Sequence, residues 1–340
     1  MPFALAAIVA LLALPLAARA TDAPSETPVA QEITLTSGDT PLSGYLYRPE
    51  EPGRHPAVLC LHAFGSDAES LRGTAATLAQ FGYVAAAIDL RGAGRSAGKP
   101  EFAAGEVQDA LATLTYLRQQ EWVDPERVAL WGAGTGGTVA LLAAAADPRL
   151  KAAAALLAPT DTAAFTTALA QQAPPLAEAI TNAVGATPAQ DSDAYRRRSP
   201  IHAAARIRAA VLAIYAAQDA LVPPIHGRNL RLAMQKAGRS CTVQVHPGNG
   251  PAALAGASLA MIRFLNETLR NTPATGSRRS CLLRCMDLLE QLRVRQIAGS
   301  PVSADLFTEC DIALAAFQAG KYRLADQLLT EALAALARSR

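Results

Sequence analysis

Short apolar runs alternate with stretches of helical spacing over most of the chain. The apolar runs are Ala57–Leu61, Tyr83–Leu90, a run from Val128 into Gly132, Ala152–Ala158, Ala210–Tyr215 and Thr242–His246. Helical spacing follows them at Ala68–Phe81, Glu106–Gln120, Thr138–Ala146, Ile225–Ala237 and Ala252–Leu269. Continuous apolar runs are typical of parallel strands that are buried on both faces. The pattern therefore predicts an α/β fold with a doubly wound, mostly parallel sheet.

Two segments depart from this alternation. Residues 32–47 alternate apolar and polar positions, which predicts a pair of antiparallel strands. Residues 160–200 contain Pro174-Pro175 and Ala-rich helical stretches, which predict a helical, lid-like insertion. Asp124-Pro125-Glu126-Arg127 predicts a turn before the Val128 strand. The main domain is expected to span residues 31–270.

The last part of the chain predicts a helical appendage. Residues 271–279 contain Pro, Gly and Ser and are expected to be a linker, and residues 280–340 hold three helical patterns. The segment from Phe317 to Leu333 is similar to one tetratricopeptide-type helix pair. Because a single such pair cannot bury its apolar face alone, the helices either dock on the main domain or bind a protein partner.

The N-terminus predicts export. Residues 1–20 carry an apolar core that ends in Ala18-Arg19-Ala20, the pattern of a cleavable signal peptide, and residues 21–30 form a polar leader. An uncleaved membrane anchor is the alternative interpretation. Cleavage predicts a periplasmic or secreted protein that makes no membrane contact afterwards.

Charge and cysteine spacing exclude several classes of site. The net charge of +2 argues against nucleic acid as a partner. Metal-ligand spacing is absent, so neither metal nor cofactor is expected. Of the five cysteines, Cys60 and Cys241 are expected to be buried thiols. In an oxidising compartment, Cys310 is expected to form a disulfide with Cys281 or Cys285.

Five motifs in chain order carry a resemblance to a known family. They are the loops Leu61–Gly65 and Asp89–Ser96, the glycine-rich corner Gly132–Gly136, the loop Tyr215–Pro223, and the loop His246–Pro251. Together they resemble the α/β-hydrolase superfamily, nearest to its dienelactone-hydrolase and acyl-peptidase-like esterases. The resemblance covers residues 32–269.

The resemblance implies a degenerate catalytic triad. Asp219 keeps the acid position, whereas Gly134 stands at the nucleophile position and Pro251 at the histidine position. The backbone N–H groups of Phe64 and Thr135 are implied as the oxyanion hole. Both replacements suit the backbone, since glycine tolerates the strained elbow and proline is preorganised for a first helical turn.

Other residues near these motifs have less support as substitutes. Thr135 is either a substitute nucleophile or, the favoured interpretation, a hydroxyl that caps a helix. His62 resembles a loop-shaping residue, His226 falls on a helix, and His246 needs a different loop path to act as a base. Without its histidine, Asp219 is otherwise an ordinary loop carboxylate.

These observations favour an exported pseudo-hydrolase that binds a small acyl ligand in its pocket, or a protein partner through the C-terminal helices. The alternative is an active ester, thioester or peptide hydrolase with a non-standard residue set. A structural domain whose appendage performs the function is a third hypothesis.

Overall fold

The computed structural model describes residues 28–249, 257–297, 306, 310, 312–313, 315–317 and 319–338. The predicted signal peptide and Pro251 therefore lie outside the described residues. The chain divides into two compact units, and in the described residues these are 28–271 and the parts of 272–338 given above. Each unit is described separately. No helix among the described residues is both long and apolar enough to span a membrane.

The larger unit is built on an eight-stranded sheet in the order β1-β2-β4-β3-β5-β6-β7-β8. Its strands are β1 (Gln31–Ser37), β2 (Thr40–Tyr47), β3 (His55–Leu61), β4 (Val84–Ile88), β5 (Val123–Ala133), β6 (Ala152–Leu156), β7 (Ala210–Ala216) and β8 (Cys241–His246). β2 pairs antiparallel with both β1 and β4, and all other neighbours are parallel. The predicted α/β fold is confirmed.

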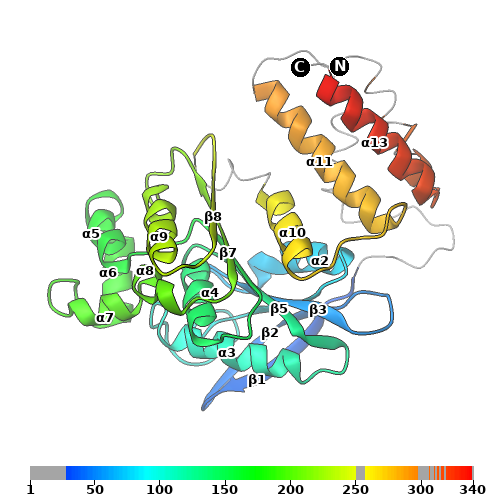
Figure 1. The fold of residues 1–340 in the computed structure, drawn as a ribbon. Helices are drawn as coiled ribbons and strands as arrows, with labels where there is room; N and C mark the ends of the chain where they lie inside the picture. The colour runs from blue at the N-terminus through cyan, green and yellow to red at the C-terminus, as the bar shows by residue number, and fades with distance from the viewer. Residues whose placement is uncertain are drawn as a thin grey trace. The chain divides into compact units, whose positions relative to one another are not determined.

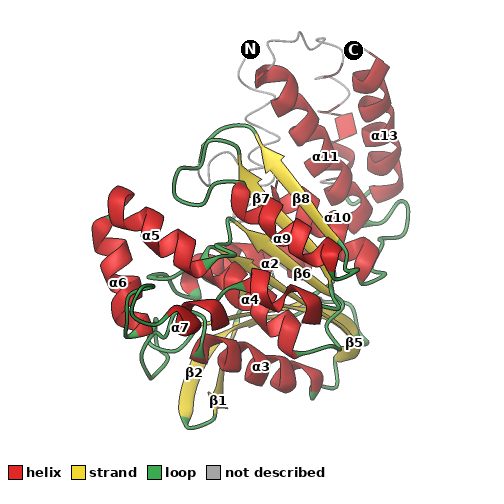
Figure 2. Cartoon of the chain, turned by 60° about the vertical axis from the view of Figure 1, so that its left-hand side comes forward, coloured by secondary structure: helices red, strands yellow, loops and turns green. Residues whose placement is uncertain are grey.

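Helices cover both faces of the sheet (Figures 1 and 2). The helices of this unit that flank the sheet are α2 (Arg72–Gln80), α3 (Gly105–Arg118), α4 (Thr135–Ala146), α9 (Ile225–Lys236) and α10 (Ala257–Thr268). Helices α3, α4 and α9 pack on one face through a large cluster that includes Leu114, Leu141 and Leu230. Because both faces are covered, the central strands β3, β4 and β6 consist almost entirely of apolar residues.

The turn predicted at residues 124–127 is wrong. These residues belong to β5, which begins at Val123. Val123 is in register with His55, and the His55 N–H donates to the Trp122 carbonyl at 3.0 Å. This pairing holds the Asp-Pro segment in an extended conformation, and the register shifts between His55 and Ala57.

Residues 160–200 contain helices, as the sequence predicts. They form α5 (Thr162–Gln172), α6 (Pro174–Val184) and α7 (Ser192–Arg197), and α8 (Pro200–Ala203) follows. The Asp161 and Asp191 carboxylates accept N–H groups at the starts of α5 and α7. Pro174 occupies the first turn of α6, where proline fits without losing a hydrogen bond.

The smaller unit contains α11 (Arg278–Ile297) and α13 (Tyr322–Arg338). Helical residues between them include Leu306 and Cys310, and their apolar side chains join one buried cluster with both helices. Asp326 accepts hydrogen bonds from Ser280 Oγ at 2.6 Å and Arg284 Nε at 2.8 Å, which ties α13 to α11.

All five cysteines are free thiols, so the predicted disulfide of Cys310 is wrong in this structure. Cys281, Cys285 and Cys310 are buried together in the apolar cluster of the smaller unit. The Cys281 thiol donates to the Tyr322 carbonyl at 3.1 Å. Burial raises the pKa of the Cys285 thiol to about 12, which opposes the thiolate that oxidation requires.

Candidate functional site

The glycine-rich corner joins β5 to α4. Gly134 has φ 54° and ψ −124°, and its N–H donates to the Leu156 carbonyl at 2.8 Å. A Cβ on Gly132 would lie 2.2 Å from the Gly136 oxygen, and one on Gly136 would lie 2.2 Å from the Leu61 oxygen. Close backbone packing therefore requires glycine at positions 132 and 136.

Gly134 is glycine for a different reason. A Cβ at this position would meet only Ala63, with its Cβ 3.1 Å away. The space around Gly134 therefore admits a small side chain after a slight adjustment. The positive φ is the main cost, because L-residues rarely adopt this conformation.

Thr135 is the first residue of α4, and Gly134 is the capping residue. No hydrogen bond of the Thr135 hydroxyl is found among the described residues. The prediction that this hydroxyl caps the helix is therefore wrong in this structure. Instead, Thr135 lines a cavity beside the corner.

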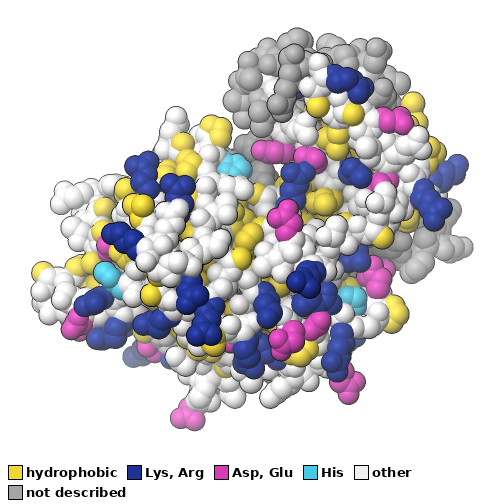
Figure 3. All heavy atoms as spheres, viewed as in Figure 1, with side chains coloured by type: hydrophobic (Ala, Val, Ile, Leu, Met, Phe, Trp, Pro, Cys, Tyr) yellow, Lys and Arg dark blue, Asp and Glu magenta, His cyan; other side chains and the backbone are white. Residues whose placement is uncertain are grey.

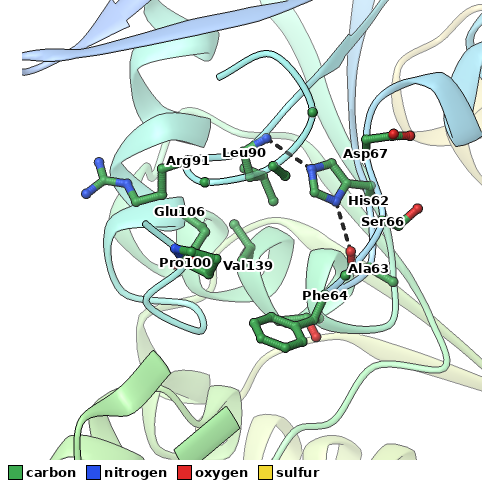
Figure 4. Close-up of a pocket in the computed structure, with 15 residues that line it drawn as sticks. His62, Ala63, Phe64, Ser66, Asp67, Leu90, Arg91, Pro100, Glu106 and Val139 are labelled. Carbon is green, nitrogen blue, oxygen red and sulfur yellow. Dashed lines mark hydrogen bonds between the residues drawn. The ribbon is translucent and has the colours of Figure 1, made fainter. Parts of the chain in front are cut away.

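The cavity has a volume of about 320 Å³. It is lined by the loops that follow β3 and β4 and by the first turns of α3 and α4 (Figure 4). Its lining residues include Ala63, Phe64, Leu90, Pro100, Glu106, Thr135 and Val139. The Phe64 ring packs edge-on against the buried Phe102, with ring centroids 5.4 Å apart. The cavity therefore brings Phe64 and Thr135, the two predicted oxyanion residues, into one site.

His62 shapes this cavity and is buried (Figure 4). Its Nε2 accepts the Leu90 N–H at 3.0 Å, and its Nδ1 donates to the Ala63 carbonyl at 2.9 Å. Burial lowers the pKa of His62, so the imidazole is neutral near pH 7. Because both ring nitrogens form hydrogen bonds with backbone groups, His62 holds two loops together and has no free nitrogen for proton transfer.

Glu106 is a cavity residue that the sequence analysis missed. The residue is 5% exposed, and its carboxylate accepts N–H groups from Glu101 at 2.7 Å and from Phe102 and Ala104 at 3.1 Å. Burial raises the pKa of Glu106, and the backbone donors oppose that shift. Phe102 and Ala103 have φ values of 50° and 64°. Glu106 therefore holds a strained loop against the cavity.

Arg91 reinforces the same loop. Its guanidinium pairs with Asp109 at 2.8 Å and with Glu101 at 2.8 Å, and the carboxylates raise its pKa. The Glu101 carbonyl also accepts a hydrogen bond from Arg198 Nε at 3.0 Å. Charged groups from three segments of the chain therefore fix the cavity wall, and of these Asp109 is fully buried.

Asp219 lies outside the cavity lining. Its Oδ1 accepts the N–H groups of Leu221 at 2.9 Å and Val222 at 2.8 Å, and the residue is 8% exposed. No hydrogen bond to Oδ2 is found among the described residues. The carboxylate therefore shapes its own turn and keeps one oxygen available.

Two further histidines also lie outside the cavity lining. His226 is buried on α9, and its Nδ1 accepts the Thr160 N–H at 3.3 Å. Burial lowers the pKa of His226. His246 ends β8, where its carbonyl accepts the Ala217 N–H at 2.8 Å. Within the described residues no group of three or more metal-ligating side chains is assembled.

Comparisons with known proteins agree with the fold. Residues 69–263, more than half of the chain, match the prolyl oligopeptidase family (peptidase S9). Acylaminoacyl peptidase from Pyrococcus horikoshii has a similar fold, with a TM-score of 0.63 and 17% identity over 73% of this chain and 43% of that chain.

Two curated relatives match a shorter region. The quorum-quenching protein AidA of Acinetobacter baumannii is 32% identical over 125 residues, which are 36% of this chain and 41% of AidA. The thiohydrolase aneE of Aspergillus aculeatus is 34% identical over 121 residues, or 34% of this chain and 37% of aneE. The matched region spans less than half the length of either relative.

The chain belongs to the prolyl oligopeptidase family and has the α/β-hydrolase fold that its sequence motifs predict.

Proposed function

We propose that this member of the prolyl oligopeptidase family is an exported, non-catalytic protein that binds a small acyl ligand beside its glycine corner. One observation carries the proposal: the apex of the strand–turn–helix corner is Gly134, which has no side chain. Acyl transfer by the family's triad needs a side-chain nucleophile at this apex.

Among the described residues that line the cavity, no imidazole has a free ring nitrogen. His62 uses both ring nitrogens to join two loops, and His226 and His246 do not line the cavity. Position 251, where the resemblance places the catalytic histidine, is proline. A proline side chain can neither accept nor donate a proton, so the second requirement of the triad is also unmet.

The cavity nevertheless keeps features that suit a small acyl group. Its walls combine apolar side chains such as Phe64, Leu90 and Val139 with a few polar groups. The N–H of Thr135 lies at the start of α4, where helix geometry favours a carbonyl or carboxylate oxygen. We assign the oxyanion position to the N–H groups of Thr135 and Phe64, and Asp219 to the vestigial acid position.

A second candidate function is hydrolysis through Thr135. Thr135 and Glu106 line the same cavity, and burial raises the pKa of Glu106 toward the range of a general base. The relative aneE is named a thiohydrolase, so a thioester is the substrate class for this alternative. Against it, both carboxylate oxygens of Glu106 already accept backbone N–H groups.

A test of the proposal combines turnover and binding. Purified protein should hydrolyse short-chain aryl esters and thioesters no faster than a folded, non-hydrolytic control. Short-chain carboxylates should still raise its unfolding temperature, because a ligand that binds only the folded state stabilises it.

Stoichiometric, saturable labelling by a fluorophosphonate would refute the non-catalytic proposal. Loss of that labelling in Thr135→Ala, with Thr138→Ala as the matched control, would support the second candidate instead. Thr138 is a suitable control because it lies on the same helix and is buried with its hydroxyl bonded to the Pro159 carbonyl, away from the cavity lining.

A further inference from the structure

The segment 206–246, which contains β7, α9 and β8, has an uneven charge distribution. It carries six basic residues and one acidic residue, Asp219, whereas the whole chain has a net charge of +2. The basic residues are Arg206, Arg208, Arg228, Arg231, Lys236 and Arg239. No ion pair of any of the six is found among the described residues, and Asp219 is buried.

Exposed apolar side chains share this segment. Within the described part of residues 28–271, four of the five exposed large apolar residues are Leu221, Ile225, Leu232 and Val245, which are 45–49% exposed. Scattered single apolar residues are normal on a protein surface, but a local group marks an interaction site.

The outward side of α9 carries part of this group. His226, Leu230 and Met234 are buried toward the sheet. Ile225, Arg228 and Leu232 follow one another at intervals of three and four residues, so they share one outward stripe. Arg231 and Lys236 are also exposed on the helix.

Val245, on β8, lies on the face of the sheet that α9 covers. A Cβ on Gly227 of α9 would contact both the Tyr215 ring and Val243, so those side chains face α9. Val245 pairs with Tyr215 and lies two residues after Val243, so it points to that face as well.

Hydrogen bonds connect the two ends of α9 with neighbouring loops. The Gln218 N–H donates to the Gly248 carbonyl at 2.9 Å, which places the loop before α9 beside the end of β8. At the other end of α9, Arg239 Nε donates to the Ala205 carbonyl at 3.3 Å, next to Arg206. Figure 3 shows dark blue and yellow side chains together where Figure 1 draws α9.

We propose that the α9 surface, formed by Leu221, Ile225, Arg228, Arg231, Leu232, Lys236 and Val245, docks on an anionic phospholipid membrane. Basic residues attract the negative leaflet while the apolar side chains insert at the boundary between head groups and acyl chains. A surface for nucleic acid needs basic groups for the phosphates but has no use for exposed leucine and isoleucine among them.

The sequence predicts no membrane contact after signal cleavage, and the proposed docking surface departs from that prediction. Peripheral docking does not need a spanning helix, because the attachment is made by side chains on one face of a folded domain. It is independent of the proposed ligand cavity, since none of its residues lines that cavity.

The test is co-sedimentation of the full chain with vesicles. One set contains phosphatidylglycerol and phosphatidylcholine in equal amounts, and the other contains phosphatidylcholine alone. The chain should bind the anionic vesicles more tightly, and the difference should shrink as salt rises from about 50 mM to about 500 mM. The apolar segment 1–20 is common to all variants, and the neutral vesicles measure its contribution.

Variants separate charge from apolar insertion. Each basic residue near an anionic leaflet strengthens binding about fivefold, so R228Q/R231Q should weaken it by about 25-fold. The matched control, R54Q/K99Q, removes the same charge at two exposed residues outside the α9 surface and should change binding less than about twofold. I225S/L232S should weaken binding to anionic vesicles by roughly tenfold without changing its salt dependence.

Equal binding of the wild type to both vesicle sets would overturn the proposal. An equal loss in R54Q/K99Q and R228Q/R231Q would do the same, because it would reveal only an overall charge effect. Binding of a DNA duplex at the same salt, with no preference for anionic vesicles, would assign the surface to nucleic acid instead. Thermal unfolding of each variant establishes that it is folded.

Discussion

The strongest test of the vestigial-triad interpretation is to restore the missing side chains at positions 134 and 251. Gly134→Ser supplies a hydroxyl at the apex of the corner, and Pro251→His supplies an imidazole at the position that the family resemblance assigns to it. Position 251 lies outside the described residues, so its assignment rests on the sequence alone. Asp219 keeps Oδ2 without a hydrogen bond in the described structure, as an acid partner for that imidazole requires.

The structure sets the expected stability cost of the serine. A non-glycine residue at φ 54° and ψ −124° is strained by about 1–3 kcal/mol. Contact of the new Cβ with Ala63 Cβ at 3.1 Å requires only a small displacement. Gly134→Ser should therefore lower the free energy of unfolding by about 1–3 kcal/mol, measured from denaturant midpoints.

Activity should depend on both changes together, because members of a triad act as a unit. Gly134→Ser alone has no imidazole to take the proton, and Pro251→His alone has no nucleophile. The double variant should be the only one with substantial turnover of short-chain aryl esters. The matched control is G134A/P251H, which has the same backbone strain but no hydroxyl and should be inactive.

Two results would refute this reasoning. Equal activity in Gly134→Ser and the double variant would show that another base already serves the corner. Unchanged stability in both Gly134→Ser and Gly134→Ala would show that the backbone at this position does not impose the strain assigned to it.

Three further predictions concern buried titratable groups. His62 and His226 have lowered pKa values in the folded chain. Below pH ~6.5 these two side chains therefore bind more protons in the unfolded chain than in the folded chain. The free energy of unfolding should fall as pH drops below that value, and less so in H62N/H226N. Glu106 has a raised pKa, so its contribution to the free energy of unfolding should fall as pH rises above about 4.3. Glu106→Gln should flatten that slope and, by leaving the N–H of Ala104 without its acceptor, cost about 1–3 kcal/mol. Mass mapping of native, alkylated protein should find Cys285 unmodified until the chain is unfolded, and rapid native labelling would contradict its burial.

The sequence predicted the fold well because its strands are buried on both faces. Strands such as β4 and β6 contain only small and branched apolar residues, and this pattern appears directly in the sequence. The glycine corner was equally visible, since Gly132 and Gly136 each make a backbone contact that no other residue tolerates. The β5 extension was missed because Asp124-Pro125 has turn chemistry, and only pairing with His55 overrides it.

The cavity was less predictable, because its walls depend on contacts between distant segments. Glu106 appeared as an ordinary helix-start carboxylate, and its role depends on the loop at residues 101–104 folding back onto it. The positive φ values of Phe102 and Ala103 carry no sequence signal, since neither is glycine. Thr135 was misassigned as a cap because its hydroxyl has the right chemistry, whereas Gly134 has the conformation of the capping residue.

The proposed loss of a nucleophile at Gly134 is compatible with an intact cavity. The corner is held by the tight approach of Gly132 to Gly136 and by the Gly134 N–H bond to Leu156, and none of these contacts uses a side chain at position 134. The cavity walls are held separately, by His62 and Glu106. The proposed ligand binding therefore does not depend on a nucleophile at position 134. Substitutions at Gly134 should leave carboxylate binding close to the wild-type level, whereas substitutions at His62 or Glu106 should weaken it.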